Sequence, residues 1–180
     1  NTGCAPPKRP RAAKFVRYID PMMEVLVYLY ENYGHGAACP RSEQLSRKLD
    51  SVGFPQAEIA LALDWLDGLR LAIQDTQRPP ERPLHHAPAL ADSMRIYTPM
   101  EQAQLGPDCI GFIRFLEQAA GLGTHLREIL IDRAMAATDK PVALHDFKTM
   151  ALMVYWGAGE EPETLVLDEL CDDGVGRVAH

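Results

Sequence analysis

The chain of 180 residues lacks any apolar run long enough to cross a membrane. Its best candidate, MALMVYW (150–156), has seven residues, whereas a transmembrane helix needs about 18 consecutive apolar residues. The first 20 residues also lack the apolar core of a secretory signal peptide. We therefore predict a cytoplasmic protein without membrane segments.

Cysteine is scarce, and no two cysteines form a Cys-x-x-Cys pair. Without a secretory signal we expect reduced thiols at Cys4, Cys39, Cys109 and Cys171. His35 and Cys39 have a spacing that metals use, but they lie in a loop with no second pair nearby in sequence. Since a zinc site needs about four nitrogen or sulfur ligands at suitable spacing, the sequence predicts no metal site.

Recognisable catalytic and phosphate-binding motifs are missing as well. Cys109 lies early in an apolar helix, where a helix N-terminus can lower a thiol pKa, but no histidine stands at a coupled spacing, so we expect a packed thiol. Glu128 and Asp132 are four residues apart, and such exposed like charges repel slightly, which is typical of a solvated face. These patterns indicate a non-enzymatic protein with no cofactor.

Negative charge dominates the body of the chain, whose formal net charge is −7. Residues 1–20 carry five basic residues and one acidic residue, so the remainder holds 13 bases and 24 acids, a net charge of −11. Such a body repels phosphate backbones. Nucleic acid is therefore a disfavoured partner.

The first 20 residues differ in character from the rest. They contain three prolines and no helical or strand periodicity, so we expect a disordered basic extension over residues 1–20. The helical apolar pattern begins at Met22 and Met23, and our hypothesis is that natural translation starts at one of them. A rival interpretation is a basic arm that touches nucleic acid.

Apolar spacing predicts three helices before residue 70. Asp20 and Pro21 are typical of an N-cap and a first helical position, and this first helix runs to Tyr33. Helices over 42–52 and 55–69 follow, with apolar residues recurring every three or four positions.

Two partly alternating segments, LRLAIQD (69–75) and SMRIYT (93–98), are predicted to pair as a β-hairpin. The prolines between them predict a loop rather than a helix. Three helices followed by a hairpin is the order of a winged helix, in which the helix over 55–69 would be the recognition helix.

Helices also dominate the second half of the chain. Thr98, Pro99 and Glu101 have the pattern of a capping box with proline at the first helical position. This short helix is predicted to end at Gly106, and Pro107 opens another. Further helices are predicted from Thr124, over 144–156 and over about 162–172. The predicted fold is mainly α, with a winged-helix-like module over 21–98 packed on a helical bundle over 99–180 that ends in an acidic helix.

Acidic helical faces are the predicted interaction surface. The outer face of the helix over 55–69 presents Glu58, Asp64 and Asp67, and the last helix presents Glu169. Carboxylates oppose the phosphates of a duplex, whereas a winged-helix-like module can also serve as a protein platform. We therefore predict a non-enzymatic adaptor or regulator that binds another, unidentified protein.

The alternative function is a winged-helix regulator of DNA metabolism that associates with nucleic acid. Arg41, Arg47 and Lys48 form a small basic cluster around the second helix. Under this alternative they would contact phosphates, while the simpler interpretation of such a cluster is solvated surface.

Six strings, in order along residues 22–158, resemble the Smg family of small bacterial proteins. They are VLVYLYENY (25–33), QLSRKLDSVGF (44–54), WLDGL (65–69), SMRIYTP (93–99), GFIRFLEQ (111–118) and DFKTMALMVYW (146–156). The resemblance implies a proteobacterial cytoplasmic protein with no known cofactor and no assigned biochemical role, and it transfers no functional residues. Genes of this family commonly lie near those of a DNA-processing protein and a topoisomerase, which is an associational link to DNA metabolism.

Overall fold

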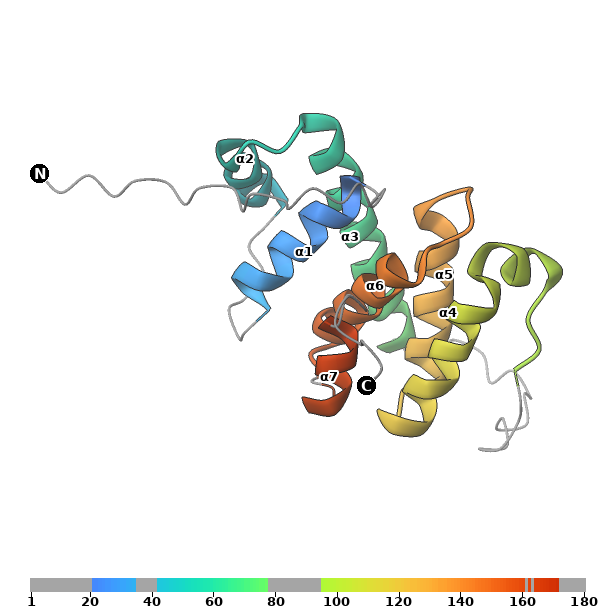
Figure 1. The fold of residues 1–180 in the computed structure, drawn as a ribbon. Helices are drawn as coiled ribbons and strands as arrows, with labels where there is room; N and C mark the ends of the chain where they lie inside the picture. The colour runs from blue at the N-terminus through green and yellow to red at the C-terminus, as the bar shows by residue number, and fades with distance from the viewer. Residues whose placement is uncertain (1–20, 35–41, 78–94, 161, 163, 172–180) are drawn as a thin grey trace, which may run out of the picture. The chain divides into compact units, whose positions relative to one another are not determined.

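The computed structural model describes residues 21–34, 42–77, 95–160, 162 and 164–171 (Figure 1). These residues form seven helices: α1 (Pro21–Tyr33), α2 (Ser42–Val52), α3 (Gln56–Gln77), α4 (Pro99–Ala119), α5 (Thr124–Ala137), α6 (Leu144–Ala158) and α7 (Thr164–Cys171). The prediction of a mainly α fold is confirmed. The predicted basic extension and the proline-rich loop lie outside the described residues.

The predicted β-hairpin, and with it the winged-helix-like module over 21–98, is wrong, because the described part of the chain contains no strand. Residues 69–75 continue α3 as helix. Leu69 and Ile73, one helical turn apart, are buried, whereas Leu71 between them is 64% exposed. The alternation in LRLAIQD therefore came from one exposed leucine, and the buried residues follow the helical period.

The chain divides into two compact units within α3, at Leu66, whereas the sequence analysis divides it after residue 98. In the first unit, α1 buries one stripe that includes Val25, Leu26 and Leu29, and α2 buries Leu45 and Leu49. Beyond α2 the chain turns, and the Phe54 ring meets the Tyr28 ring edge-on with centroids 5.5 Å apart.

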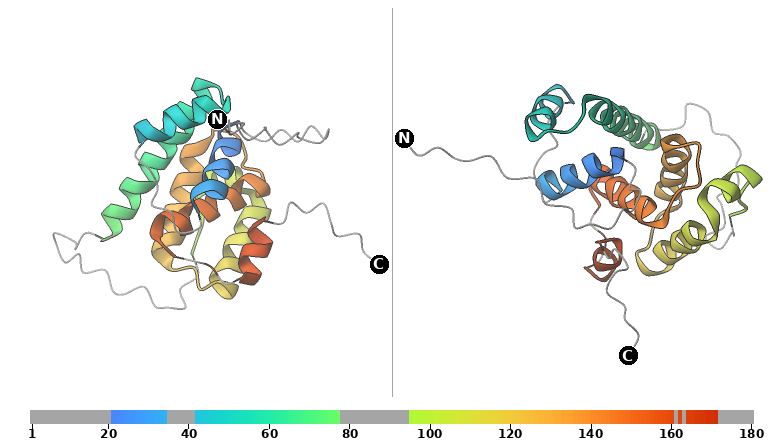
Figure 2. Two further views of the ribbon diagram at one scale, coloured as in Figure 1. Left: turned by 90° about the vertical axis from the view of Figure 1, so that its left-hand side faces the viewer. Right: turned by 45° about the horizontal axis from the view of Figure 1, so that its top comes forward.

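The second unit is built around α6. In this unit α5 packs against both α4 and α6, and α7 packs against α6 (Figure 2). Nine of the fifteen residues of α6 are buried, which is the pattern of a central helix rather than of a helix with one wet face. At its end Gly157 permits close contact, since a Cβ there would lie 3.0 Å from the Cδ1 of Ile73 in α3.

A buried lysine attaches the last helix to this unit. Lys148 in α6 donates from Nζ to the backbone oxygen of Glu169 at 2.6 Å and to its Oε1 at 2.9 Å. The same Nζ lies 5.5 Å from the centroid of the Phe112 ring in α4. Because an ammonium group with few water contacts needs such partners, Lys148 makes α7 part of the fold.

The start of α4 has the predicted cap. The Thr98 hydroxyl accepts from the Glu101 backbone N–H, and the Glu101 carboxylate accepts from the Thr98 N–H. At Gly106 the backbone leaves helical geometry, with φ 66° and ψ 174°, and Pro107 begins a second segment. The predicted helix end at Gly106 is confirmed, and we treat α4 as two segments joined by a kink, visible as a sharp turn in Figure 1.

Candidate functional site

The segment just before α4 carries an arginine that holds two carboxylates. The Arg95 guanidinium donates to both oxygens of Glu101 at 2.9 and 3.0 Å. It also donates to both oxygens of Glu128, on α5, at 2.8 to 3.0 Å. Its Cζ lies 4.7 Å from the centroid of the Tyr97 ring. This double bidentate arrangement fixes the entry of α4 against α5.

Glu101 serves the helix cap and the arginine at once. Hydrogen bonds from Arg95, together with the backbone N–H of Thr98, lower the pKa of Glu101 to about 2. The side chains of Arg95 and Glu101 are only 17% and 15% exposed. The pair is therefore well shielded from water, unlike an ordinary surface ion pair.

Arg127 extends these contacts into an ion-pair network. It donates from Nη1 to Glu117 Oε1 at 2.6 Å and from Nε to Glu128 Oε1 at 2.9 Å. Glu101 precedes the kink of α4 and Glu117 follows it, while Arg127 and Glu128 belong to α5. The network of Arg95, Glu101, Glu117, Arg127 and Glu128 thus connects both segments of α4 to one neighbouring helix and fixes the angle between them.

Tyr97 lies beside this network and is 8% exposed. Burial, and after it the charge of Glu117, raises the pKa of Tyr97, so the phenol stays neutral at physiological pH. Its backbone oxygen accepts a hydrogen bond of 2.8 Å from Nε2 of Gln102. Arg95 therefore packs on the ring from the same segment, and Gln102 of α4 holds the backbone of Tyr97.

An open groove of about 460 Å³ runs over the kink of α4. The groove is lined mainly by apolar atoms, from Tyr97, Gln102, Gly106, Pro107, Ile110, Gly111 and Arg114. Two glycines create it. Gly106 supplies the left-handed backbone of the kink, and Gly111 leaves space, since a Cβ there would meet nothing within 4 Å.

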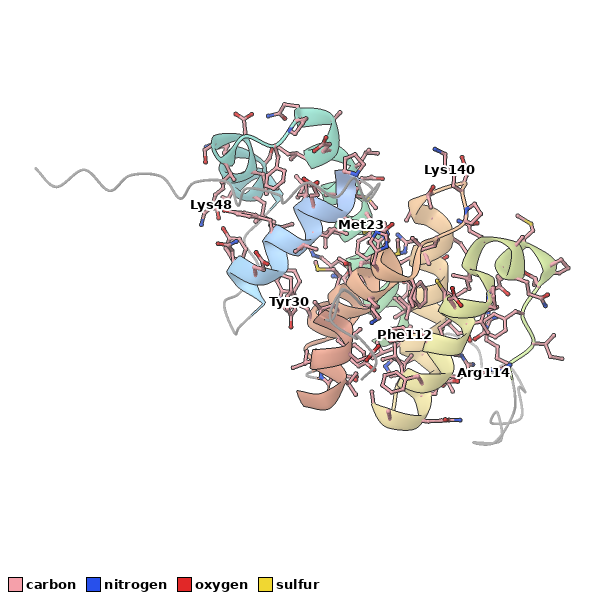
Figure 3. The ribbon with its side chains drawn as sticks, in the orientation of Figure 1. Met23, Tyr30, Lys48, Phe112, Arg114 and Lys140 are labelled. Carbon is pink, nitrogen blue, oxygen red and sulfur yellow. The ribbon has the colours of Figure 1, made fainter. Side chains whose placement is uncertain are left out.

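A charged side chain lies at the edge of this groove. Arg114, on the segment of α4 that follows the kink (Figure 3), is exposed and makes no hydrogen bond or ion pair with any described residue. Apolar side chains before and within the first turn of α4 are also open to water, Ile96 at 88% and Met100 at 75%. This part of the second unit therefore combines a fixed frame, an apolar hollow and a cation that has no partner among the described residues.

The predicted acidic residues are divided between the two units, with Glu58 and Asp64 in the first and Asp67 and Glu169 in the second. Asp64 is exposed and Glu58 is half-buried, both within the first unit. Asp67 accepts from Nη1 of Arg70 at 2.9 Å, and Glu169 accepts from Lys148 at 2.9 Å. Two of the four carboxylates are therefore already occupied by bases of the chain itself.

The predicted phosphate contacts are described only in part. Arg47 and Lys48 are exposed on α2, where Figure 3 labels Lys48. The Lys48 Nζ lies 4.9 Å from the centroid of the Tyr33 ring. Arg41 lies outside the described residues. Because the described residues form no strand, they supply no wing that would complete a duplex-binding face with these bases.

Neither the network nor the groove is predicted from the sequence. The prediction that Glu128 and Asp132 share a solvated face is incomplete, since Glu128 binds Arg95 and Arg127, while Asp132 pairs with Arg133 at 2.7 Å. The unusual string SMRIYTP was the available signal, because it contains Arg95, Tyr97 and the cap residue Thr98.

The thiol and metal predictions can be set beside the structure. Cys109 is buried, and its Sγ donates to the Val142 backbone oxygen at 3.6 Å. Burial raises the pKa of Cys109 to about 12, which favours the predicted packed thiol over a nucleophile. Among the described residues, no three metal-ligating side chains gather, and none of the described helices is long and apolar enough to span a membrane.

Comparison with known proteins gives one family and several relatives. The profile of the family described as "Protein of unknown function (DUF494)" matches residues 22–180. The "Protein Smg homolog" of Methylibium petroleiphilum is 49% identical over 159 residues, which cover 88% of this chain and all of the relative. Those of Leptothrix cholodnii and Aromatoleum aromaticum are 50% and 45% identical, also over 88% of this chain and over 100% and 97% of the relatives. No solved structure matches the chain.

Proposed function

The chain belongs to the DUF494 family of Smg homologues, for which the family description gives no function, and we propose that it is a non-enzymatic adaptor that binds another protein. The observation that carries this proposal is the open groove at the kink of α4. Concave, mainly apolar surface is typical of interaction sites.

The form of the groove favours a protein segment over a small substrate. A small-molecule site usually encloses most of its ligand and converges several polar groups on it. Here the hollow is open, and the Gln102 amide is already bonded to Tyr97. Chemistry that depends on excluding water would not be served by such a surface.

The network supports the same function. It holds both segments of α4 and the Tyr97 ring before any partner arrives. A preformed surface loses little conformational freedom on binding, which leaves more of the interaction free energy for affinity.

Acidic surfaces are a second part of this proposal. Asp64 is exposed and has no basic partner among the described residues, so of the four predicted acidic residues it is the most open to a basic residue of a partner. Asp67 and Glu169 are less suited, because each already accepts from a base of this chain.

Site-specific photocrosslinking tests the proposal. A photoreactive phenylalanine analogue at Met100, which is 75% exposed in the second unit, is compared with the same residue at Leu61, which is 59% exposed in the first unit. We expect a discrete crosslinked protein from position 100 in lysate of the native host, identified by mass spectrometry. Absence of a defined product at both positions would count against an adaptor.

A charge reversal separates the acidic contribution from the groove. Asp64→Lys in the Met100 crosslinking background is expected to weaken the product if a basic partner surface contacts α3, whereas Glu31→Lys, at an exposed acid on α1 of the same unit, serves as the control. Equal yields in the two variants would leave the groove as the contact and would remove Asp64 from the proposal.

A further inference from the structure

We propose that the groove at the kink of α4 binds a partner peptide in which an apolar side chain stands beside a carboxylate, the apolar group lying on Ile110 and Gly111 and the carboxylate binding Arg114. This inference rests on the proposed protein-binding function and adds the chemistry of the partner.

Arg114 is available to a ligand because the glutamates of the network are bound by other arginines. Arg95 holds Glu101 and Glu128, and Arg127 holds Glu117 and Glu128. Glu117 is three residues after Arg114 on the same helix, and it is the acid of that helix turn that could have paired with it. Since Arg127 binds Glu117 at 2.6 Å, the Arg114 guanidinium retains donors for an incoming carboxylate.

The missing side chain at Gly111 indicates that the ligand carries an apolar group. Gly111 has no side chain and nothing lies within 4 Å of the position that a Cβ would take. Pro107 and Ile110 add apolar surface on either side, and the Tyr97 ring, held by Arg95, adds another wall. An aliphatic side chain placed over Gly111 removes this surface from water, which is favourable.

The helix spacing brings the two parts together. Arg114 follows Gly111 by three residues and Ile110 by four, so the three share one face of α4. A ligand whose apolar group covers Gly111 therefore needs its carboxylate within a residue or so of that group to reach the guanidinium.

The surrounding charge disfavours a polyanion in the same place. The network contains two arginines and three glutamates, and the whole chain carries a net charge of −7. A single carboxylate can bind Arg114 directly, whereas each further phosphate of a nucleic acid would meet this negative field. An acidic-apolar peptide fits this balance better than an oligonucleotide.

The test uses the full chain and two probes that differ only in charge, N-acetyl-L-leucine and N-acetyl-L-leucinamide, titrated to millimolar concentration and followed by ¹H–¹⁵N NMR. We expect the acid to shift the backbone signals of Gly106 and Gly111 and the side-chain Nε signal of Arg114. The amide should bind about tenfold more weakly, as the loss of one charge-assisted contact predicts.

Variants locate the binding. Arg114→Gln should abolish the difference between acid and amide, while Arg47→Gln, at an exposed arginine of α2, should preserve it. Gly111→Leu should remove binding of both probes by filling the groove, and the space around this position indicates that the variant folds. Circular dichroism checks its folding, and if it fails to fold, Arg114→Gln with the two probes decides alone.

Several results would overturn the proposal: equal binding of acid and amide, retention of their difference in Arg114→Gln, or no shift with either probe. Inorganic phosphate shifting the same signals at lower concentration would indicate an anion site instead. Shifts that depend on protein concentration without any probe would assign the groove to a second copy of the chain. A crosslinked protein at Met100 that persists while the probes fail would leave the adaptor function standing and refute only the peptide chemistry.

Discussion

Replacing Arg95 with methionine tests whether the ion-pair network holds the second unit together. The substitution removes the guanidinium and keeps most of the apolar stem, so the change in stability comes mainly from charge. In the parent protein the hydrogen bonds from Arg95 lower the pKa of Glu101 to about 2, from an ordinary value of 4.5. By linkage such a shift corresponds to about 3 kcal/mol of stability at neutral pH.

Partial exposure to water reduces this contribution to the free energy of unfolding. The two side chains are 17% and 15% exposed, and the bond from Thr98 to Glu101 remains in the variant, so we expect Arg95→Met to lose about 1–2 kcal/mol at pH 7. The matched control is Arg70→Met, which breaks an ion pair of the same 2.9 Å length whose side chains are about half exposed. That pair should contribute less than about 0.5 kcal/mol.

The pH dependence gives an independent check. A carboxyl whose pKa is depressed by folding adds stability that is present above its unfolded pKa and is lost as the pH falls toward the folded pKa. For Glu101 this window runs from about 4.5 down to about 2. The difference in stability between the parent and Arg95→Met should therefore be smaller at pH 3 than at pH 7, and it should continue to fall toward pH 2.

Urea unfolding followed by circular dichroism measures these differences at both pH values. The reasoning is refuted if Arg95→Met and Arg70→Met lose the same free energy of unfolding at pH 7. It is also refuted if the loss in Arg95→Met is as large at pH 3 as at pH 7, since the depressed pKa of Glu101 would then have no part in it.

Three further predictions concern other parts of the second unit. Gly106→Ala should cost about 1–3 kcal/mol in thermal unfolding, because the combination of φ 66° and ψ 174° is open essentially only to glycine. Gly111→Ala should instead stabilise the helix by about 0.5–1 kcal/mol, and the reverse order would contradict the kink. Lys148→Met should expose the backbone amides of α7 to hydrogen exchange, because the buried ammonium group holds that helix, whereas Lys140→Met, at an exposed lysine, should not. Cys109 should react with iodoacetamide at pH 8 at least about tenfold more slowly in the folded than in the urea-unfolded chain, since burial raises its pKa to about 12; equal rates by peptide mass spectrometry would refute this.

Local signals in the sequence were enough to place most helices. The Thr98–Glu101 capping box and the Gly106–Pro107 break depend on residues within a few positions of one another, and both occur as predicted. The error at 69–75 also has a local cause, because seven residues with one exposed leucine fit a strand pattern as well as a helix pattern. Only the apolar spacing of the whole of α3, through Leu69 and Ile73, distinguishes the two.

The candidate site required information that local patterns do not contain. Arg95 and Glu128 are 33 residues apart, and no spacing rule joins an extended segment to a later helix. The four predicted acidic residues were chosen for their charge alone, yet whether a carboxylate is free depends on which base folding brings to it. Lys148 forms an ion pair with Glu169, and Arg70 forms one with Asp67. Composition does not predict these pairs.

The pairing of carboxylates with bases in the folded chain also explains why we expect Arg114 to bind the ligand. A helix rich in both charges normally satisfies its arginines through neighbours one turn away, and Glu117 stands at that distance from Arg114. In the folded chain Glu117 instead accepts a hydrogen bond of 2.6 Å from Arg127, and this contact joins α5 to α4. The network that fixes the kink thereby leaves one cation without a partner among the described residues, next to the hollow that the kink creates. Arg127→Met should therefore free Glu117 to pair with Arg114 and should weaken N-acetyl-L-leucine binding without changing the groove wall. Unchanged binding in that variant, measured by the same NMR titration, would show that the network and the groove act independently.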